Sequence, residues 1–272
     1  MATAAVNGTE LFYEDLGGSG PVCLLLHGGL GFDHTHFRPD FDALAPRQRV
    51  VYYDHRGNGR SGRPPLETLT MEQLADDAAG LLDHLGVQRA RVIGHSYGGF
   101  IAQEFALRHP DRLEALVLID TTPGQLGEGE EEDTRGLAPP PEFLAAMSTP
   151  PANDDEFAAM GPKIMPFYFH RPEKVDIAGH MARTIYSVDA MMQSMMVLAG
   201  WSSVDRLHQI SAPTLALFGR RDVITSWPQG ERIASRVPGA TLHVFEESGH
   251  FPWLEEHDEF FAVLTRWIDD LG

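Results

Sequence analysis

The residues best suited to chemistry lie in the run Gly94-His95-Ser96-Tyr97-Gly98-Gly99. It follows a short apolar stretch typical of a strand, residues 91–93, and precedes a helical pattern. A serine between glycines at a strand–turn–helix junction is typical of a nucleophile elbow, a tight turn that exposes the serine hydroxyl. Larger side chains at Gly94 and Gly98 would collide with neighbouring backbone. The pattern predicts Ser96 as a catalytic nucleophile.

A serine hydroxyl is a weak nucleophile at neutral pH, so this prediction requires a histidine base and an acid that orients it. His250 follows the apolar run 242–245, and Asp222 follows the apolar run 214–218. Open α/β sheets build their sites at the carboxyl ends of strands. We therefore predict His250 as the base and Asp222 as the orienting acid. Asp120, which also ends an apolar run, is the rival acid.

A glycine-rich run, His27-Gly28-Gly29-Leu30-Gly31, directly follows another apolar stretch, residues 22–26. Acyl transfer places negative charge on the former carbonyl oxygen, and preorganised N–H donors stabilise that charge. Glycine leaves the approach to the backbone open. We therefore expect the backbone N–H groups of Gly29 and Tyr97 to form an oxyanion hole.

Other groups that could carry chemistry are weaker candidates. His34 and His36 invite a zinc interpretation, but the Asp-His pair that completes a zinc-lactonase motif does not follow them, and we interpret both as surface residues. Asp54 lies in a glycine-rich context that predicts a structural turn. The single cysteine, Cys23, excludes an internal disulfide and a cysteine-based zinc site. The sequence predicts neither a metal nor a cofactor.

The order of apolar segments predicts how these loops are brought together. Unbroken apolar runs, typical of strands buried on both faces of a parallel sheet, occur at residues 22–26, 50–53, 91–93, 116–119 and 214–218. Helical patterns separate them, such as residues 71–85, where apolar residues recur with a period near 3.6. The sequence around Asn7-Gly8 predicts a hairpin. Together these segments predict an α/β fold with helices on both faces of the sheet.

The alternation of strands and helices stops between residues 121 and 203. An acidic stretch rich in glycine and proline, with residues 127–133 its most acidic part, comes first, and helical segments such as 177–199 follow. We expect residues 121–203 to form a helical lid, and residues 1–120 and 204–272 to form the α/β core. The predicted apolar pocket is lined by Leu30, Phe167, Met191, Met195, Trp201 and Phe251.

These motifs and their order resemble the α/β-hydrolase fold family over nearly the whole chain. His-Gly-Gly-x-Gly and Tyr-Asp-x-Arg-Gly-x-Gly-x-Ser are similar to the corresponding motifs of proline iminopeptidase-like members. The resemblance implies an eight-stranded, mostly parallel sheet with one antiparallel strand and a helical lid inserted after the sixth strand. It also implies a Ser96–His250–Asp222 triad and no cofactor.

Charge and composition limit the partners. The 272-residue chain has 21 Lys and Arg against 39 Asp and Glu, a formal net charge of −18. Such a chain repels phosphate backbones and anionic lipids, so we expect neither nucleic acid nor membrane as a partner. No basic, apolar leader and no apolar run of about 18 residues is present, so we expect a cytoplasmic protein.

The sequence favours a serine esterase or lactonase acting on small carboxylic esters or lactones, acyl-homoserine lactones included. An aminopeptidase that releases N-terminal proline is the alternative, with the acidic residues 127–133 binding the free amine. A non-catalytic binding protein with this fold is the third hypothesis. The sequence names neither the substrate nor the oligomeric state.

Overall fold

A computed structural model of the chain describes residues 1–124 and 133–272. Its centre is an eight-stranded sheet with the strand order β1-β2-β4-β3-β5-β6-β7-β8. The strands are β1 (Ala2–Val6), β2 (Thr9–Asp15), β3 (Val22–Leu26), β4 (Arg49–Tyr53), β5 (Ala90–His95), β6 (Leu113–Ile119), β7 (Thr214–Gly219) and β8 (Thr241–Phe245). Strand β2 is antiparallel to both neighbours, and every pair from β4 to β8 is parallel. The predicted mostly parallel sheet is confirmed.

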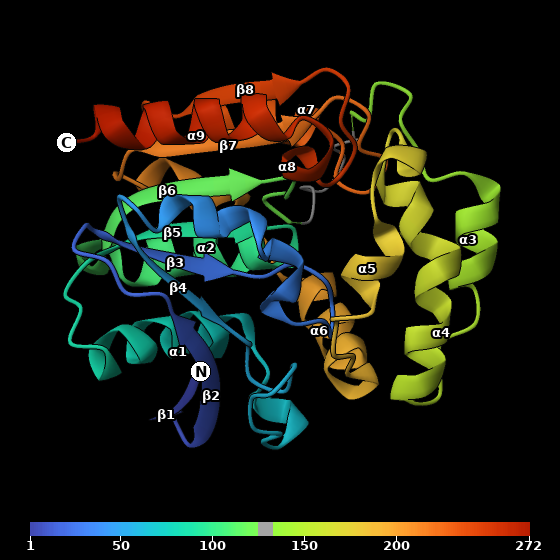
Figure 1. The fold of residues 1–272 in the computed structure, drawn as a ribbon, viewed down its shortest axis with the longest axis horizontal. Coiled ribbons are helices and arrows are strands. Elements are labelled where there is room, and N and C mark those ends of the chain that lie inside the picture. The colour runs from blue at the N-terminus through green and yellow to red at the C-terminus, as the bar shows by residue number, and fades with distance from the viewer. Residues whose placement is uncertain (125–132) are drawn as a thin grey trace.

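Successive residues of the central strands enter separate apolar clusters on the two faces of the sheet. Leu24 and Leu26 belong to one cluster, which α1 (Met71–His84), α2 (Tyr97–Arg108) and α7 (Pro228–Ala234) complete. Cys23 and Leu25 belong to the other, which α8 (Pro252–Glu255) and α9 (His257–Asp270) complete. Figure 1 shows α9 in front of β7 and β8. The predicted helices on both faces are confirmed, and burial of both faces explains the unbroken apolar runs.

Local signals fix the ends of the predicted elements. Asn7 and Gly8 both have positive φ, 46° and 78°, and form the tight turn between β1 and β2. Thr70 caps α1, because its hydroxyl accepts a hydrogen bond from the backbone N–H of Gln73 (3.1 Å). Gly86, with φ of 67°, follows the end of that helix. None of the helices in residues 1–124 and 133–272 combines the length and apolarity needed to span a membrane.

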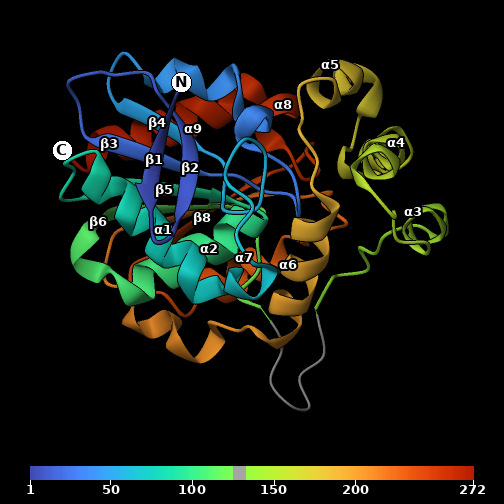
Figure 2. The same ribbon diagram turned by 90° about the horizontal axis from the view of Figure 1, so that it is seen from below.

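Between β6 and β7 the chain forms α3 (Pro141–Met147), α4 (Asp154–Ile164), α5 (Ile177–Met181) and α6 (Val188–Gly200). These inserted helices lie at the side of the sheet toward which the strands point (Figures 1 and 2). The prediction of one helical segment over residues 177–199 is wrong. Ser187 caps a separate helix α6, with its hydroxyl accepting from the N–H of Ala190 (3.3 Å). Of the acidic stretch 127–133, residues 127–132 lie outside the described residues.

Candidate active site

Ser96 lies in the sharp turn between β5 and α2, and its side chain is half-buried. Its backbone has φ of 50° and ψ of −116°, a region that residues other than glycine rarely adopt. A Cβ at Gly98 would overlap the carbonyl oxygen of Leu26, and a Cβ at Gly94 would overlap that of Gly98. The collision expected from the sequence at both glycines is therefore confirmed. The turn sets Ser96 at the carboxyl end of a central strand.

His250 and Asp222 form a buried pair at neighbouring strand ends. The Nδ1 of His250 lies 2.7 Å from Oδ2 of Asp222, and their side chains are 2% and 0% exposed. Asp222 also accepts hydrogen bonds from the N–H of Ile224 (2.7 Å) and the hydroxyl of Thr225 (2.7 Å). Burial alone raises the pKa of Asp222, but the His250 charge and these hydrogen bonds outweigh it and hold the pKa below its ordinary value. A carboxylate at Nδ1 leaves Nε2 as the proton acceptor.

The glycine-rich loop after β3 is held by a histidine. The N–H of Gly28 donates to Nε2 of His36 (3.3 Å), whose Nδ1 donates to the carbonyl of Asp33 (3.1 Å). Burial lowers the pKa of His36 well below its ordinary value, which favours the neutral ring that this pattern needs. Tyr97 is the first residue of α2, so its N–H has no partner within the helix. The oxyanion role of Gly29 and Tyr97 remains a prediction.

These groups meet at a cavity of about 280 Å³. It is lined by Gly28, Gly29, Leu30, Phe32, His36, His95, Ser96, Tyr97, Phe100, Met147, Phe157, Ile164, Tyr168, Met191, Met195, Leu198, Ile224, Thr225, His250 and Phe251. Among the described residues, none of this lining is Asp, Glu, Lys or Arg. The cavity therefore brings Ser96, His250 and the two residues of the predicted oxyanion hole, Gly29 and Tyr97, to one wall without Asp, Glu, Lys or Arg. Such a set can attack a carbonyl and stabilise the resulting oxyanion.

A family model described as "alpha/beta hydrolase fold" matches residues 21–257. The chain belongs to this family. A protein of Caulobacter vibrioides named as the carbamate hydrolase RutD is 42% identical, over 99% of this chain and 98% of its own. A proline iminopeptidase of Clostridioides difficile is 26% identical, over 96% and 95%. The enol-lactonase of Burkholderia xenovorans LB400 superposes with a TM-score of 0.79 at 26% identity, over 98% of this chain and all of its own.

In this α/β-hydrolase the inserted segment supports the His250 loop. The N–H of His250 donates to the carbonyl of Tyr168 (2.7 Å). One carboxylate, Glu255, accepts from the N–H of Gly249 (2.6 Å) and from the N–H of Arg171 (2.7 Å). His95 donates from Nε2 to the carbonyl of His250 (3.0 Å). The position of the histidine therefore depends on residues that follow α4 as well as on the core.

The structure places only part of the predicted pocket at the cavity. Leu30, Met191, Met195 and Phe251 line it, whereas Phe167 and Trp201 are outside the lining that the described residues form. Phe167 packs edge-on against Phe143, with ring centroids 6.0 Å apart. Tyr168, the next residue, lines the cavity in its place. The indole N–H of Trp201 donates to the buried carboxylate of Glu104 (3.0 Å), which turns the ring toward α2.

The other predicted histidines have structural partners. His34 is buried and contacts Oδ1 of Asp54 through Nδ1 (2.6 Å), so interpreting it as a surface residue is wrong. Asp54 also accepts from the N–H of Arg60 (2.8 Å), within the glycine-rich turn. Across residues 1–124 and 133–272, no group of three or more His, Cys, Asp or Glu side chains is arranged to hold a metal ion.

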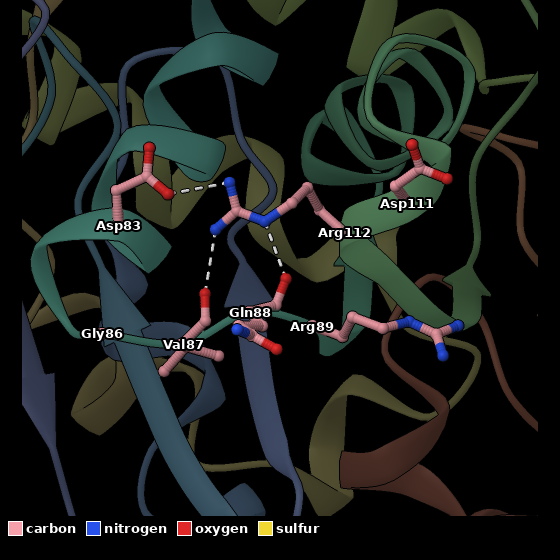
Figure 3. Close-up of a pocket in the computed structure, with 7 residues that line it drawn as sticks. All are labelled: Asp83, Gly86, Val87, Gln88, Arg89, Asp111 and Arg112. Atoms are coloured by element: carbon pink, nitrogen blue, oxygen red, sulfur yellow. Dashed lines mark hydrogen bonds and ion pairs between the residues drawn. The ribbon is translucent and has the colours of Figure 1, made fainter.

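A second hollow, of about 510 Å³, lies near the starts of β5 and β6, at the end of these strands opposite to Ser96. Figure 3 shows Arg112 reaching across it to Asp83. The guanidinium is 2.8 Å from that carboxylate and donates to the carbonyls of Val87 (2.9 Å) and Gln88 (2.7 Å). These contacts tie the end of α1 to the segment before β6. We therefore interpret this hollow as structural.

Proposed function

We propose that the protein is a serine hydrolase of small carboxylic esters or lactones with an apolar acyl part. One observation carries the proposal: the half-buried Ser96 and His250, which is paired with Asp222, line the same cavity, and its described lining contains no Asp, Glu, Lys or Arg. The volume of about 280 Å³ lies just below the range of about 300–1,000 Å³ common for small-molecule sites. A small, neutral, largely apolar substrate fits such a space.

The proposed reaction proceeds through an acyl-enzyme. Ser96 Oγ attacks the substrate carbonyl carbon while Nε2 of His250 takes the hydroxyl proton. The carbonyl oxygen becomes an oxyanion, which the N–H groups of Gly29 and Tyr97 stabilise. Collapse breaks the bond to the leaving oxygen, and His250 returns the proton to it. Water then attacks the acyl-serine while His250 takes one of its protons. The bond to Ser96 Oγ breaks, His250 returns the proton to Oγ, and the acid is released. The scheme uses no cofactor.

We further propose that residues 121–203 act as a lid over this site. The inserted helices supply Phe157 and Ile164 from α4 and Met191 and Met195 from α6 to the cavity wall. Methionine side chains adapt to differently shaped apolar groups, which suits an acyl-binding wall. The enol-lactonase with a similar fold supports including lactones among the substrates to be tested.

The aminopeptidase hypothesis requires a negative group for the free amine of an N-terminal proline. The described cavity lining offers no carboxylate, although a proline iminopeptidase is among the relatives. Asp133 pairs with Arg135 (3.3 Å), and the preceding acidic residues lie outside the described part of the chain. Carbamate hydrolysis is the other alternative, because a relative is named as a carbamate hydrolase. The described lining contains neither Lys nor Arg to pair with an anionic carbamate. These features favour the ester and lactone proposal over both alternatives.

The acyl wall makes a measurable prediction. In p-nitrophenyl esters from acetyl to octanoyl, each added methylene should raise kcat/KM up to about fourfold until the cavity is full, since burying a methylene stabilises by about 0.8 kcal/mol. In Ile164→Phe, kcat/KM should stop rising at a shorter acyl chain, because this buried residue lines the cavity and the larger ring leaves less space. Leu144→Phe is the matched control, since Leu144 is 57% exposed and lies outside the lining.

The same assay should include lactones, acyl-homoserine lactones, a carbamate and proline-naphthylamide. We expect the amide and the carbamate to be turned over far more slowly than the best ester. Fast turnover of the proline amide, lost when its amine is acetylated, would establish the aminopeptidase hypothesis instead. Binding of these compounds without any turnover would favour the non-catalytic hypothesis.

A further inference from the structure

Asp120 is a buried acid with an unused oxygen. It directly follows β6, has φ of 39° and is 0% exposed. Its Oδ1 accepts a hydrogen bond from the N–H of Gly219 at the end of β7 (2.8 Å). Its Oδ2 is buried and accepts no hydrogen bond from any group in the described part of the chain. A buried carboxyl oxygen without a partner is costly, so this one requires an explanation.

The neighbour that provides the explanation is Asp222. Asp120 and Asp222 follow the adjacent strands β6 and β7. Gly219 joins them, because its N–H donates to Asp120 and its carbonyl accepts from the N–H of Asp222 (3.3 Å). Two buried carboxylates this close do not both ionise. Asp222 receives hydrogen bonds from Ile224, Thr225 and His250, whereas Asp120 receives one from Gly219. The anion is therefore better stabilised on Asp222, and the proton stays on Asp120.

The surrounding charges agree with this assignment. Burial and the Asp222 carboxylate raise the pKa of Asp120 well above its ordinary value. The negative charge of Glu255 raises the pKa of Asp120 further. The hydrogen bond from Gly219 acts in the opposite direction and is outweighed. The carboxylates of Asp222 and Glu255 thus both favour the neutral form of Asp120.

We propose that Asp120 is a positioning residue, a neutral acid that donates a hydrogen bond from Oδ2 to Asp222 and thereby holds that carboxylate toward His250. This role rests on the proposed serine-hydrolase function, because it acts through the predicted triad. The hydrogen bond from Asp120 also stabilises the Asp222 anion. The proton in the hydrogen bond between Asp222 and His250 therefore stays on Nδ1 of His250. The proposed hydrogen bond joins residues at the ends of two adjacent strands. Asp120 therefore acts on His250 through Asp222 and does not contact the substrate.

The test compares two replacements of similar size at Asp120. Asparagine keeps both contacts, since its oxygen can accept from Gly219 and its amide N–H can donate to Asp222. Leucine removes both. With the best ester, Asp120→Asn should retain kcat to within about threefold, and Asp120→Leu should lower it by about 10- to 100-fold, the effect of losing a hydrogen bond to a charged group. KM should change little in either variant, because Asp120 lies outside the described cavity lining.

The pH dependence of thermal stability tests the protonation state of Asp120 without any substrate. If folded Asp120 keeps its proton, the unfolded chain binds fewer protons above the ordinary aspartate pKa, and wild-type stability falls as pH rises toward the folded pKa. Asparagine does not titrate. The Tm of Asp120→Asn minus that of wild type should therefore grow between pH 4 and pH 8. Infrared difference spectra of the same two proteins at pH 8 should show a protonated carboxylic acid only in the wild type.

Several results would overturn the proposal. A Tm difference that shrinks with rising pH, or no protonated-acid band, would show that Asp120 is ionised. Loss of activity in Asp120→Asn as large as in Asp222→Asn would make Asp120 a charged member of the triad. Equal activity in the asparagine and leucine variants would remove any effect on Asp222. If no ester is turned over, the function proposal fails, whereas the stability and infrared results still decide the protonation of Asp120.

Discussion

Ser96→Ala should reduce kcat for the best ester by about 10⁶-fold, the scale seen when a serine nucleophile is removed from a triad. The hydroxyl is the atom that forms the acyl bond, and alanine offers nothing in its place. The fold should persist, because Ser96 is half-buried and its loss removes one oxygen. The tight turn itself depends on Gly94 and Gly98, which remain. Steady-state kinetics and thermal melts of the two proteins test this expectation.

Ser235→Ala is the matched control, since this exposed serine at the end of α7 lies outside the cavity lining. It should keep full activity. A fluorophosphonate probe should add its mass to wild type and to the control, but not to Ser96→Ala. Activity of Ser96→Ala within tenfold of wild type, with the probe still bound elsewhere, would remove Ser96 from the mechanism.

The scaffold of the site could be predicted because its causes are local. A strand buried on both faces is apolar at nearly every position, so residues 22–26 and 214–218 are recognisable in the sequence. The elbow requires glycines at fixed spacing around Ser96, because the backbone atoms of Leu26 and Gly98 leave no room for a Cβ. Such constraints appear directly in the sequence, whichever residues the remainder of the fold brings close.

The pocket was less predictable because its wall depends on distant partners. Trp201 turns away from the cavity toward Glu104, a contact between residues 97 apart in the chain. In the short helix Met165–Tyr168, adjacent side chains point in different directions, so Tyr168 rather than Phe167 faces the cavity. On α6, Met191 and Met195 are four residues apart and both line the cavity, as predicted, while Met196 is 65% exposed. Spacing predicts a shared face, but not which face is covered.

Supporting residues were missed for a similar reason. His36 acts on the backbone N–H of Gly28, and Thr225 donates to Asp222. Neither contact follows from residue type alone, since histidine and threonine are common in exposed loops. The available signal was position: His36 lies a few residues after the glycine-rich run, and Thr225 three residues after the predicted acid.

Asp222→Asn should lower kcat by about 10³- to 10⁴-fold, with KM nearly unchanged. The amide would donate to Nδ1 of His250, which places the ring proton on Nε2, where it cannot accept the serine proton. The variant also loses the charge that stabilises the imidazolium. KM should hold, because Asp222 is outside the cavity lining that the described residues form. Single-turnover kinetics with the best ester separate the acylation step from binding.

The ranking of the two acids decides between Asp222 and its rival. Asp222 lies 2.7 Å from Nδ1 of His250, whereas Asp120 contacts the N–H of Gly219. We therefore expect Asp222→Asn to cost far more than Asp120→Leu, and Asp120→Leu more than Asp120→Asn. A deficit in Asp120→Asn exceeding that in Asp222→Asn would move the orienting charge to the strand before the inserted helices. If Asp120 acts only through Asp222, the double variant Asp120→Asn/Asp222→Asn should be no slower than Asp222→Asn alone, because the carboxylate that Asp120 positions is already removed.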